Sequence, residues 1–307
     1  MAGVDLTTNV GGLRLKNPVT VASGTFGYGT EYGDFYDASA LGAIFLKGLT
    51  LEERVGNRPQ RLVETPSGLL NSIGLQNVGF ERFVAEKLPT LEGLDTAVVA
   101  NICGSKLEEY VELARRLAGV ERIDALEVNV SCPNVKYGGM AFGCVPESTA
   151  EVTRAVRAVY AGPLIVKLSP NVTDITATAR AAEGAGADAL SVVNTFVGMA
   201  IDVRTRRPRL GNVTGGLSGP AIRPIALRMV WECWKAVKIP IIGQGGICGW
   251  EDAAEFLLAG ATAVSVGTAN FVDPAAPVAI LEGLRGWLEE QGCGSVGEVV
   301  GGMKVRG

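Results

Sequence analysis

The chain has 307 residues, of which 47% are hydrophobic, 41 are glycine and 20% are charged. A large apolar core with many tight turns is therefore expected. The net charge of −4 argues against nucleic acid or an anionic membrane as the main partner. Apolar runs stay below the ~18 residues that a membrane span needs. The N-terminus lacks the basic and apolar regions of a signal peptide, so we expect a cytoplasmic protein.

Histidine is absent from the sequence, and this limits the chemistry that the protein can perform. The commonest general base, the commonest metal ligand and every His-dependent triad are excluded. Acid–base chemistry must therefore use Cys, Lys, Tyr or a carboxylate. The six cysteines form no C-x-x-C pair, so we expect no metal site and no iron–sulfur cluster, and the thiols should be free in a reducing cytosol. They are Cys103, Cys132, Cys144, Cys233, Cys248 and Cys293.

The predicted elements begin with a hairpin over residues 4–16, with Gly11-Gly12 as its turn. Eight short apolar runs of strand character follow: Val19–Ala22, Ala43–Leu46, Ala97–Ala100, Ala125–Val130, Leu164–Val166, Ala189–Val193, Ile239–Ile242 and Ala263–Val266. Amphipathic helical patterns alternate with most of them: Lys106–Ala118, Glu147–Tyr160, Thr173–Ala185, Ala221–Val237 and Trp250–Ala259. Thr173-Asp174 resembles a helix start, and Gly186 and Gly260 resemble helix stops. Eight continuous apolar strands alternating with helices predict an α/β fold, a (β/α)8 (TIM) barrel rather than an open doubly wound sheet.

Two connections are too long for simple turns. Thr50–Asp95 is expected to hold a loop over residues 64–77 and a helix near Phe80–Leu88, and Phe196–Gly219 a small hairpin over 201–210. Both follow strand C-termini, so both should rise over the C-terminal face of the barrel, and long loops in compact domains are usually functional or disordered.

The domain organisation follows from what the sequence lacks. No linker, repeat array or low-complexity segment interrupts the pattern, so we expect a single domain over residues 1–307. The Gly-rich tail from Gly292 to Gly307 is expected to be loosely ordered.

Polar residues and glycines follow every predicted strand, at the end where such barrels carry their chemistry. They are Ser23-Gly24, Lys47-Gly48, Asn101, Asn129–Asn134, Lys167, Asn194-Thr195, Gly245-Gly246 and Gly267-Thr268. The glycine-containing pairs after strands seven and eight match the phosphate position of these barrels. Either pair alone is equally well explained as a tight turn, but the two together favour a phosphate.

Two lysines and five asparagines among these positions indicate what else the site would bind. Lys47 and Lys167 could be surface residues, but each follows a buried strand directly, so its charge would need an anion or a reduced cofactor. A Schiff-base lysine of an aldolase is the other interpretation. Each asparagine could form a turn, yet five planar amides at one face suit an amide- or imide-bearing ring, such as a pyrimidine. These are Asn71, Asn101, Asn129, Asn134 and Asn194.

Cys132 is the candidate reactive residue, in the stretch Asn129–Asn134 that leaves the fourth strand. Free cysteines are usually buried and inert, and Cys233 inside a helix fits that interpretation. Cys132 lies instead in a polar loop near two candidate cations, which would promote its thiolate. On spacing alone, both interpretations remain open for Cys132.

Residues 129–143, with Asn129-Val130-Ser131-Cys132-Pro133-Asn134 followed by Gly138-Gly139-Met140, resemble the active-site loop of class 1 dihydroorotate dehydrogenases. Further motifs agree: Ala22–Gly27, Asn71–Asn77, Val166–Asn171, Val193–Thr195, Thr214–Ala221, Ile242–Ile247 and Val266–Ala269. The resemblance spans nearly the whole chain and is closest to the NAD-linked type B catalytic subunits. It implies oxidation of dihydroorotate to orotate in pyrimidine synthesis, with hydride transfer to FMN.

The resemblance also implies a role for each site residue. The FMN positions are Ser23, Lys47, Gly48, Asn101, Asn129, Lys167, Val193, Gly219, Gly245, Gly246, Gly267 and Thr268. The substrate positions are Lys47, Asn71, Ser72, Ile73, Gly74, Leu75, Asn129, Asn194 and Thr195, with Asn134 as a weaker candidate. Cys132 matches the catalytic base.

A second subunit is implied as well, carrying FAD and a [2Fe–2S] cluster and reducing NAD, in a heterotetramer of two catalytic and two electron-transfer subunits. The chain itself has no cluster-type cysteine spacing and no G-x-G-x-x-G after a strand, which fits this division. The remaining alternatives are a fumarate-linked dihydroorotate dehydrogenase, a dihydropyrimidine dehydrogenase domain, and a Schiff-base aldolase with a phosphate site.

Overall fold

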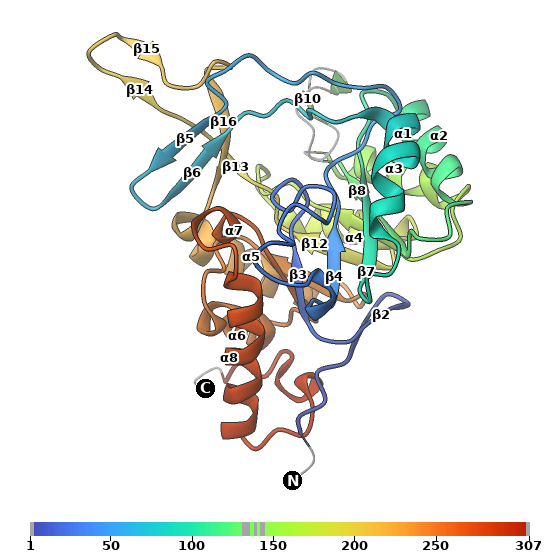
Figure 1. Ribbon diagram of the computed structural model, residues 1–307, viewed down its shortest axis with the longest axis vertical. Helices are drawn as coiled ribbons and strands as arrows, with labels where there is room; N and C mark the ends of the chain where they lie inside the picture. Colours follow the sequence, from blue (N-terminus) through green and yellow to red (C-terminus); the bar gives the residue numbers. More distant parts are fainter. Residues whose placement is uncertain (1–2, 131–135, 138–139, 142–144, 305–307) are drawn as a thin grey trace.

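Eight parallel strands close into a barrel in the computed structural model, which describes residues 3–130, 136–137, 140–141 and 145–304. Around the barrel the strands are β3 (Val19–Val21), β4 (Ala43–Phe45), β7 (Ala97–Ile102), β8 (Ala125–Asn129), β11 (Leu164–Lys167), β12 (Ala189–Val192), β17 (Ile241–Gln244) and β18 (Ala263–Val266). All eight predicted strands are present, and the predicted (β/α)8 barrel is confirmed (Figure 1). Only the seventh strand is displaced from its predicted range, Ile239–Ile242: it begins after Pro240 and runs on to Gln244.

The barrel interior is apolar at the bottom and polar at the top. Side chains of Phe45, Val99 and Ile165 fill the lower layer, and the N-terminal hairpin, β1 (Thr8–Val10) and β2 (Leu13–Leu15), packs against them through its own apolar side chains. Successive residues of a strand alternate between its two faces, so the inward positions above this layer fall on the polar strand ends. The hairpin therefore closes one end of the barrel, while the other end is free to hold a site.

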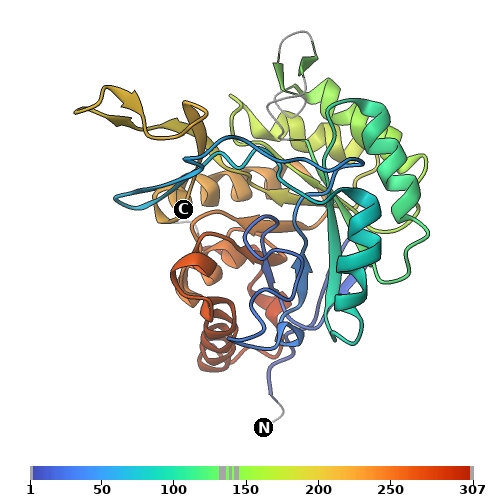
Figure 2. The same ribbon diagram turned by 45° about the horizontal axis from the view of Figure 1, so that its top comes forward.

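Helices surround the barrel where the sequence predicts them (Figure 2). They are α2 (Leu107–Leu117), α3 (Pro146–Arg157), α4 (Ile175–Gly184), α5 (Arg223–Ala236) and α6 (Trp250–Leu258). Asp174 caps α4 by accepting a hydrogen bond from the amide of Thr176, at 2.8 Å. Gly186 and Gly260 follow α4 and α6 with φ angles of +101° and +111°, so the predicted stop signals are confirmed.

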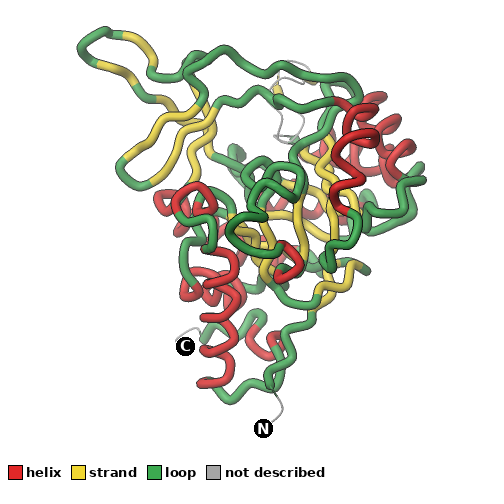
Figure 3. The backbone as a smooth tube through the Cα atoms, viewed as in Figure 1, coloured by secondary structure: helices red, strands yellow, loops and turns green. Residues whose placement is uncertain are grey.

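Residues 62–71 differ from the prediction of a loop. They form β5 (Leu62–Thr65) and β6 (Gly68–Asn71), which join β16 (Thr214–Ser218) and β13 (Phe196–Met199) in an antiparallel sheet. We call this four-stranded sheet the strap. It stands above the C-terminal face, and beyond it the predicted small hairpin, β14 (Ile201–Asp202) and β15 (Arg207–Pro208), extends outward (Figure 3). β5 and β6 pair with each other as a local hairpin, and β6 also pairs with β16, where Asn71 and its partner Gly216 are 145 residues apart. The local sequence does not reveal this second, distant pairing, which builds the hairpin into a sheet.

The remaining elements show smaller differences. The helix expected near residues 80–88 is α1 (Gly79–Arg82) followed by a π turn (Phe83–Lys87) and a 3₁₀ turn (Leu88–Leu91). Beyond the predicted elements, the chain adds α7 (Ala269–Val272), α8 (Ala276–Glu290), and a short pair in the 129–143 region, β9 (Lys136–Tyr137) and β10 (Met140–Ala141).

The expectation of a loosely ordered C-terminal tail is wrong for residues 292–304. A 3₁₀ turn (Val296–Val299) buries Val296, which is 1% exposed. The Val296 amide donates to the Asp5 carbonyl at 2.9 Å, and the Asp5 amide to the Gly294 carbonyl at 2.9 Å. The tail is thus held by the N-terminal segment, and the local sequence does not predict this contact.

Candidate active site

A cavity of about 510 Å³ lies at the C-terminal ends of the barrel strands, beneath the strap. Its described lining includes two lysines, Lys47 and Lys167, and eight side-chain amides, but no aspartate or glutamate. Such a lining favours an anionic ligand with several hydrogen-bonding groups. Every predicted site residue within the described part of the chain lines this one cavity, from Ser23 to Thr268. The structure therefore brings together residues that the sequence separates by up to 245 positions.

One end of the cavity is made of glycines from the last two barrel strands. Gly245 and Gly246 follow β17 with φ angles of +126° and +80°, and a Cβ on Gly246 would lie 2.8 Å from the carbonyl oxygen of Gly219. On the neighbouring strand end, the Thr268 hydroxyl donates to Ser218 Oγ at 2.7 Å. Only glycine fits this close approach of the two backbone segments.

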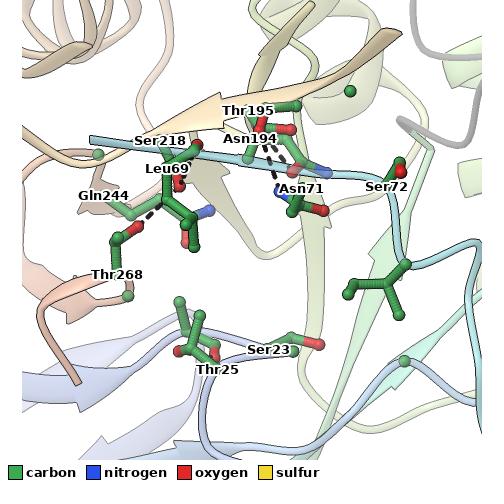
Figure 4. A pocket seen from close by; sticks show the side chains of 18 of the residues that line it. Ser23, Thr25, Leu69, Asn71, Ser72, Asn194, Thr195, Ser218, Gln244 and Thr268 are labelled. Carbon is green, nitrogen blue, oxygen red and sulfur yellow. Dashed lines mark hydrogen bonds between the residues drawn. The ribbon is translucent and has the colours of Figure 1, made fainter. Parts of the chain in front are cut away.

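The other end of the cavity is a cluster of amides held by the strap. The side chain of Asn71, at the end of β6, donates to the Gly216 carbonyl at 3.1 Å. Asn194 donates to Asn129 Oδ1 at 3.3 Å and accepts from the amide of Thr195 at 2.8 Å. In the close-up, Asn71, Asn194 and Thr195 lie together on one side, opposite Ser218 and Thr268 (Figure 4). The cavity thus has an amide-rich end and a glycine-rich end.

Lys47 and Lys167 line the cavity as well. Lys167 is 5% exposed, at the last position of β11. Burial lowers the pKa of the Lys47 ammonium; Cys103 acts in the opposite direction, and Arg61 lowers the pKa further. A buried ammonium with a lowered pKa gains from an anion placed beside it.

Asn101 lines the cavity with its amide held from both sides. Its Nδ2 donates to Glu127 Oε2 at 2.5 Å, and its Oδ1 accepts from Cys103 Sγ at 3.3 Å. Glu127 is 1% exposed and does not itself line the cavity.

Two predicted site residues, Cys132 and Asn134, lie outside the described residues, so their predicted roles stay predictions. Within residues 3–130, 136–137, 140–141 and 145–304, no group of three or more Cys, Asp or Glu side chains is placed to hold a metal ion. In the same part of the chain, no helix is long and apolar enough to cross a membrane.

The family model for dihydroorotate dehydrogenase matches residues 5–288. The chain belongs to the dihydroorotate dehydrogenase family. Similar members include proteins named dihydroorotate dehydrogenase B (NAD(+)), catalytic subunit. That of Desulforamulus reducens is 59% identical and that of Bacteroides thetaiotaomicron 54%, with matches covering 97% and 98% of this chain and 98% and 99% of theirs. The one of Geotalea daltonii is 55% identical over 99% of this chain and all of its own.

The fold of this family is also seen in a solved structure of low sequence identity. A dihydroorotate dehydrogenase of Eimeria tenella in complex with ferulenol superposes with a TM-score of 0.81, over 97% of this chain and 88% of that one. The two sequences are only 22% identical, so this likeness concerns the fold alone.

Sequence reasoning missed several polar residues that line the cavity of this dihydroorotate dehydrogenase family member. Asn171 donates to the Thr195 carbonyl at 3.0 Å and accepts from the amide of Val197 at 2.8 Å, so it holds the start of the strap in place. Others contribute from the strand ends and the strap: Thr25, Asn57, Ser169, Asn212, Thr214, Ser218, Gln244 and Ser265. Several stand one or two residues from predicted positions, and the alternation of inward residues along β11, β17 and β18 would have identified them.

Proposed function

We propose that this chain is the catalytic subunit of an NAD-linked dihydroorotate dehydrogenase, which oxidises dihydroorotate to orotate in de novo pyrimidine biosynthesis. The relatives of that name match it over nearly the full length of both chains. The observation that carries the proposal is the cavity itself, with two lysines, eight amides and no carboxylate among its described lining residues. Orotate is a planar anion with an imide ring, and such a lining complements both its charge and its hydrogen-bonding edge.

FMN fits the cavity on two observations. At the glycine-rich end the cavity is lined by residues without side chains, which lets a phosphate approach the backbone: Gly219, Gly245, Gly246 and Gly267. Within the described part of the chain, the buried atoms Gln244 Nε2 and Ser265 Oγ have no hydrogen-bond partner, and both residues line the cavity. Buried polar groups usually form hydrogen bonds, and a ligand in the cavity would supply the bonds that these two atoms lack.

We assign the FMN to the predicted cofactor residues. Gly219, Gly245, Gly246, Gly267 and Thr268 would hold the phosphate. The remaining predicted cofactor residues lie at the C-terminal ends of the barrel strands and would contact the ring system of FMN. They are Ser23, Lys47, Gly48, Asn101, Asn129, Lys167 and Val193. FMN, when bound, accepts the two electrons released from the substrate.

The substrate is assigned to the amide-rich end. Asn71 through Leu75, together with Asn129, Asn194 and Thr195, would contact the substrate, and Lys47 would be shared between substrate and flavin. The hydrogen bonds of Asn71 to Gly216 and of Asn194 to Asn129 orient these amides before a ligand arrives. Preorganised donors of this kind lose little conformational freedom on binding.

Cys132 is proposed as the base that removes the proton from C5 of dihydroorotate. A thiolate suits the task because the chain has no histidine, and the C5 proton is acidified by the neighbouring ring carbonyl. General-base catalysis of this kind contributes roughly 10²–10⁴-fold to the rate. Lys167 would offset the negative charge that develops at the barrel mouth during the oxidation, and Asn134 is a weaker candidate for substrate contact.

We further propose that electrons pass to a separate subunit that carries FAD and a [2Fe–2S] cluster and reduces NAD. The names of the relatives, which specify a catalytic subunit, support a separate partner. We propose that two catalytic and two electron-transfer subunits form a heterotetramer. We also propose that the protein is cytoplasmic and that residues 1–307 form a single domain.

Anaerobic addition of dihydroorotate to the purified, FMN-loaded chain tests the function. The flavin absorbance near 450 nm is expected to bleach, on the order of one FMN per chain. A flavin that stays oxidised would contradict the proposal, and a colourless protein trapped on a lysine by borohydride would favour the aldolase instead. Cys132→Ser should retain FMN but bleach at least about 100-fold more slowly at neutral pH. An unaffected rate would remove Cys132 from the mechanism.

A further inference from the structure

A glutamate stands in the middle of a buried barrel strand, one inward position below the cavity. Glu127 lies on β8 between Ala125, which belongs to the apolar bottom layer, and Asn129, which lines the cavity. The alternation of strand side chains places all three on the inner face. Only 1% of Glu127 is exposed. A buried carboxylate costs several kcal/mol unless it is well paired, so this position needs an explanation.

The contact of Glu127 with the cavity runs through Asn101. The two residues are direct partners in the pairing of β7 with β8, and Asn101 Nδ2 donates to Glu127 Oε2 at 2.5 Å. On the other side of the amide, Cys103 Sγ donates to Asn101 Oδ1 at 3.3 Å. A carboxylate accepts but cannot donate, so it fixes which end of the Asn101 amide carries the N–H groups. The second N–H of Asn101 is then available to a ligand in the cavity.

The charge of Glu127 also distinguishes it from the lining. The described lining has two lysines and no carboxylate, so Glu127 places a negative charge directly behind a positively charged wall. Lys167 is on the adjacent strand, two residues beyond Ile165, the pairing partner of Glu127. A negative charge near a flavin disfavours the electron-rich reduced form, and the dry interior screens this effect far less than water does.

We propose that Glu127 is a positioning residue that orients the Asn101 amide towards bound FMN and lowers the reduction potential of that flavin through its charge. This inference rests on the proposed FMN site. A purely structural glutamate would support the fold of the barrel without affecting the flavin potential, and this difference makes the proposal testable.

Glu127→Gln in the FMN-loaded protein isolates the charge. The glutamine oxygen can still accept from Asn101 Nδ2, so FMN should remain bound, but the negative charge is gone. We expect the ratio of the affinities for reduced and oxidised FMN to rise at least about tenfold, which corresponds to a midpoint potential about 30 mV more positive for a two-electron couple. Potentiometric titration against a reference dye measures it. A potential equal to that of the wild type would overturn the proposal.

Glu127→Leu removes both the charge and the acceptor. It should weaken FMN binding at least about tenfold, measured by the fluorescence of released FMN, because the buried Asn101 donor loses its partner. Glu127→Gln should restore the affinity, and equal affinities in both variants and the wild type would overturn the orienting role.

A matched control is Thr20→Val, which removes another fully buried polar group of the barrel. Thr20 Oγ1 donates to the Val264 carbonyl at 3.0 Å and does not line the cavity, so the potential should stay at the wild-type value.

If Glu127→Gln yields no folded FMN protein, Glu127→Asp tests the proposal instead. It keeps the charge but draws it back from Asn101, so weaker FMN binding is expected, and unchanged binding would overturn the proposal. A wild-type chain that binds no FMN would instead refute the proposed function.

Discussion

Single glycines define the proposed phosphate end of the cavity more sharply than any charged side chain does. Gly246 combines a φ of +80° with two backbone neighbours, the Gly219 carbonyl and the Arg223 amide, within 3.0 Å of the position of a Cβ. A side chain there would be strained and would collide with the backbone of Gly219 and Arg223. The residue type at this position is therefore determined by backbone geometry.

Gly246→Ala is expected to weaken FMN binding at least about tenfold, since backbone strain of this kind costs about 1–3 kcal/mol. Fluorescence titration of the apoprotein with FMN measures the change. Gly286→Ala in α8 is the matched control, because a Cβ there meets nothing within 4 Å. Equal losses in the two variants would show that the effect is not specific to the cavity.

Lys47 is expected to make the affinity of the cavity for an anion depend on pH. Burial lowers the pKa of its ammonium, so the group loses its proton at a lower pH than an ordinary lysine. The affinity for the orotate anion should therefore fall as the pH is raised, and the fall should begin at a lower pH than the titration of an ordinary lysine would give. Isothermal titration at several pH values checks this. Lys47→Arg keeps its charge throughout, so a pH profile as steep as that of the wild type would contradict the assignment to Lys47.

At the scale of secondary-structure elements, the N-terminal hairpin and the strap close the barrel from opposite ends. The hairpin inserts Val10, Leu13 and Leu15 into the apolar bottom layer. The strap instead contributes Asn71 and Ser218 to the top. One end is thus filled by side chains for stability, and the other is left as a cavity for chemistry.

Leu15→Ala should lower the free energy of unfolding by about 2–5 kcal/mol, because Leu15 is fully buried and its loss leaves a cavity under the barrel. Urea unfolding of the FMN-loaded protein measures it. The neighbouring Arg14→Ala, on the exposed face of the same strand, should change stability by less than about 0.5 kcal/mol. A Leu15 variant as stable as the Arg14 variant would show that the hairpin does not plug the barrel.

The same elements show which local structure can be predicted and which cannot. The alternation of apolar runs and helical patterns predicts all eight barrel strands, and Asp174, Gly186 and Gly260 mark helix ends correctly. The hairpin of β5 and β6 is local, but its place in the strap depends on the pairing of β6 with β16, far along the chain. Helix signals are local, whereas strand pairing is decided by distant partners.

At the scale of the whole molecule, the proposed function divides the reaction between two subunits. The sequence has no C-x-x-C pair and no G-x-G-x-x-G after a strand. NAD reduction by dihydroorotate should therefore appear only after the electron-transfer subunit is added to the FMN-loaded chain. The absorbance of NADH at 340 nm reports it, and the reaction without the partner is the control. NADH formation at full rate by the chain alone would contradict the two-subunit proposal.

The sequence by itself determined the barrel, its strands and the set of polar residues at the strand ends, because strand periodicity and turn residues are local properties. The tertiary structure decided how these residues meet: that Asn71 reaches Gly216, that Asn171 holds Thr195, and that the buried Glu127 stands behind Asn101. In the sequence, Glu127 is a single charged residue within an apolar run. Its hydrogen bond with Asn101 follows only from the pairing with the neighbouring strand. Contacts between distant segments depend on how the barrel closes, and barrel closure is a property of the whole chain.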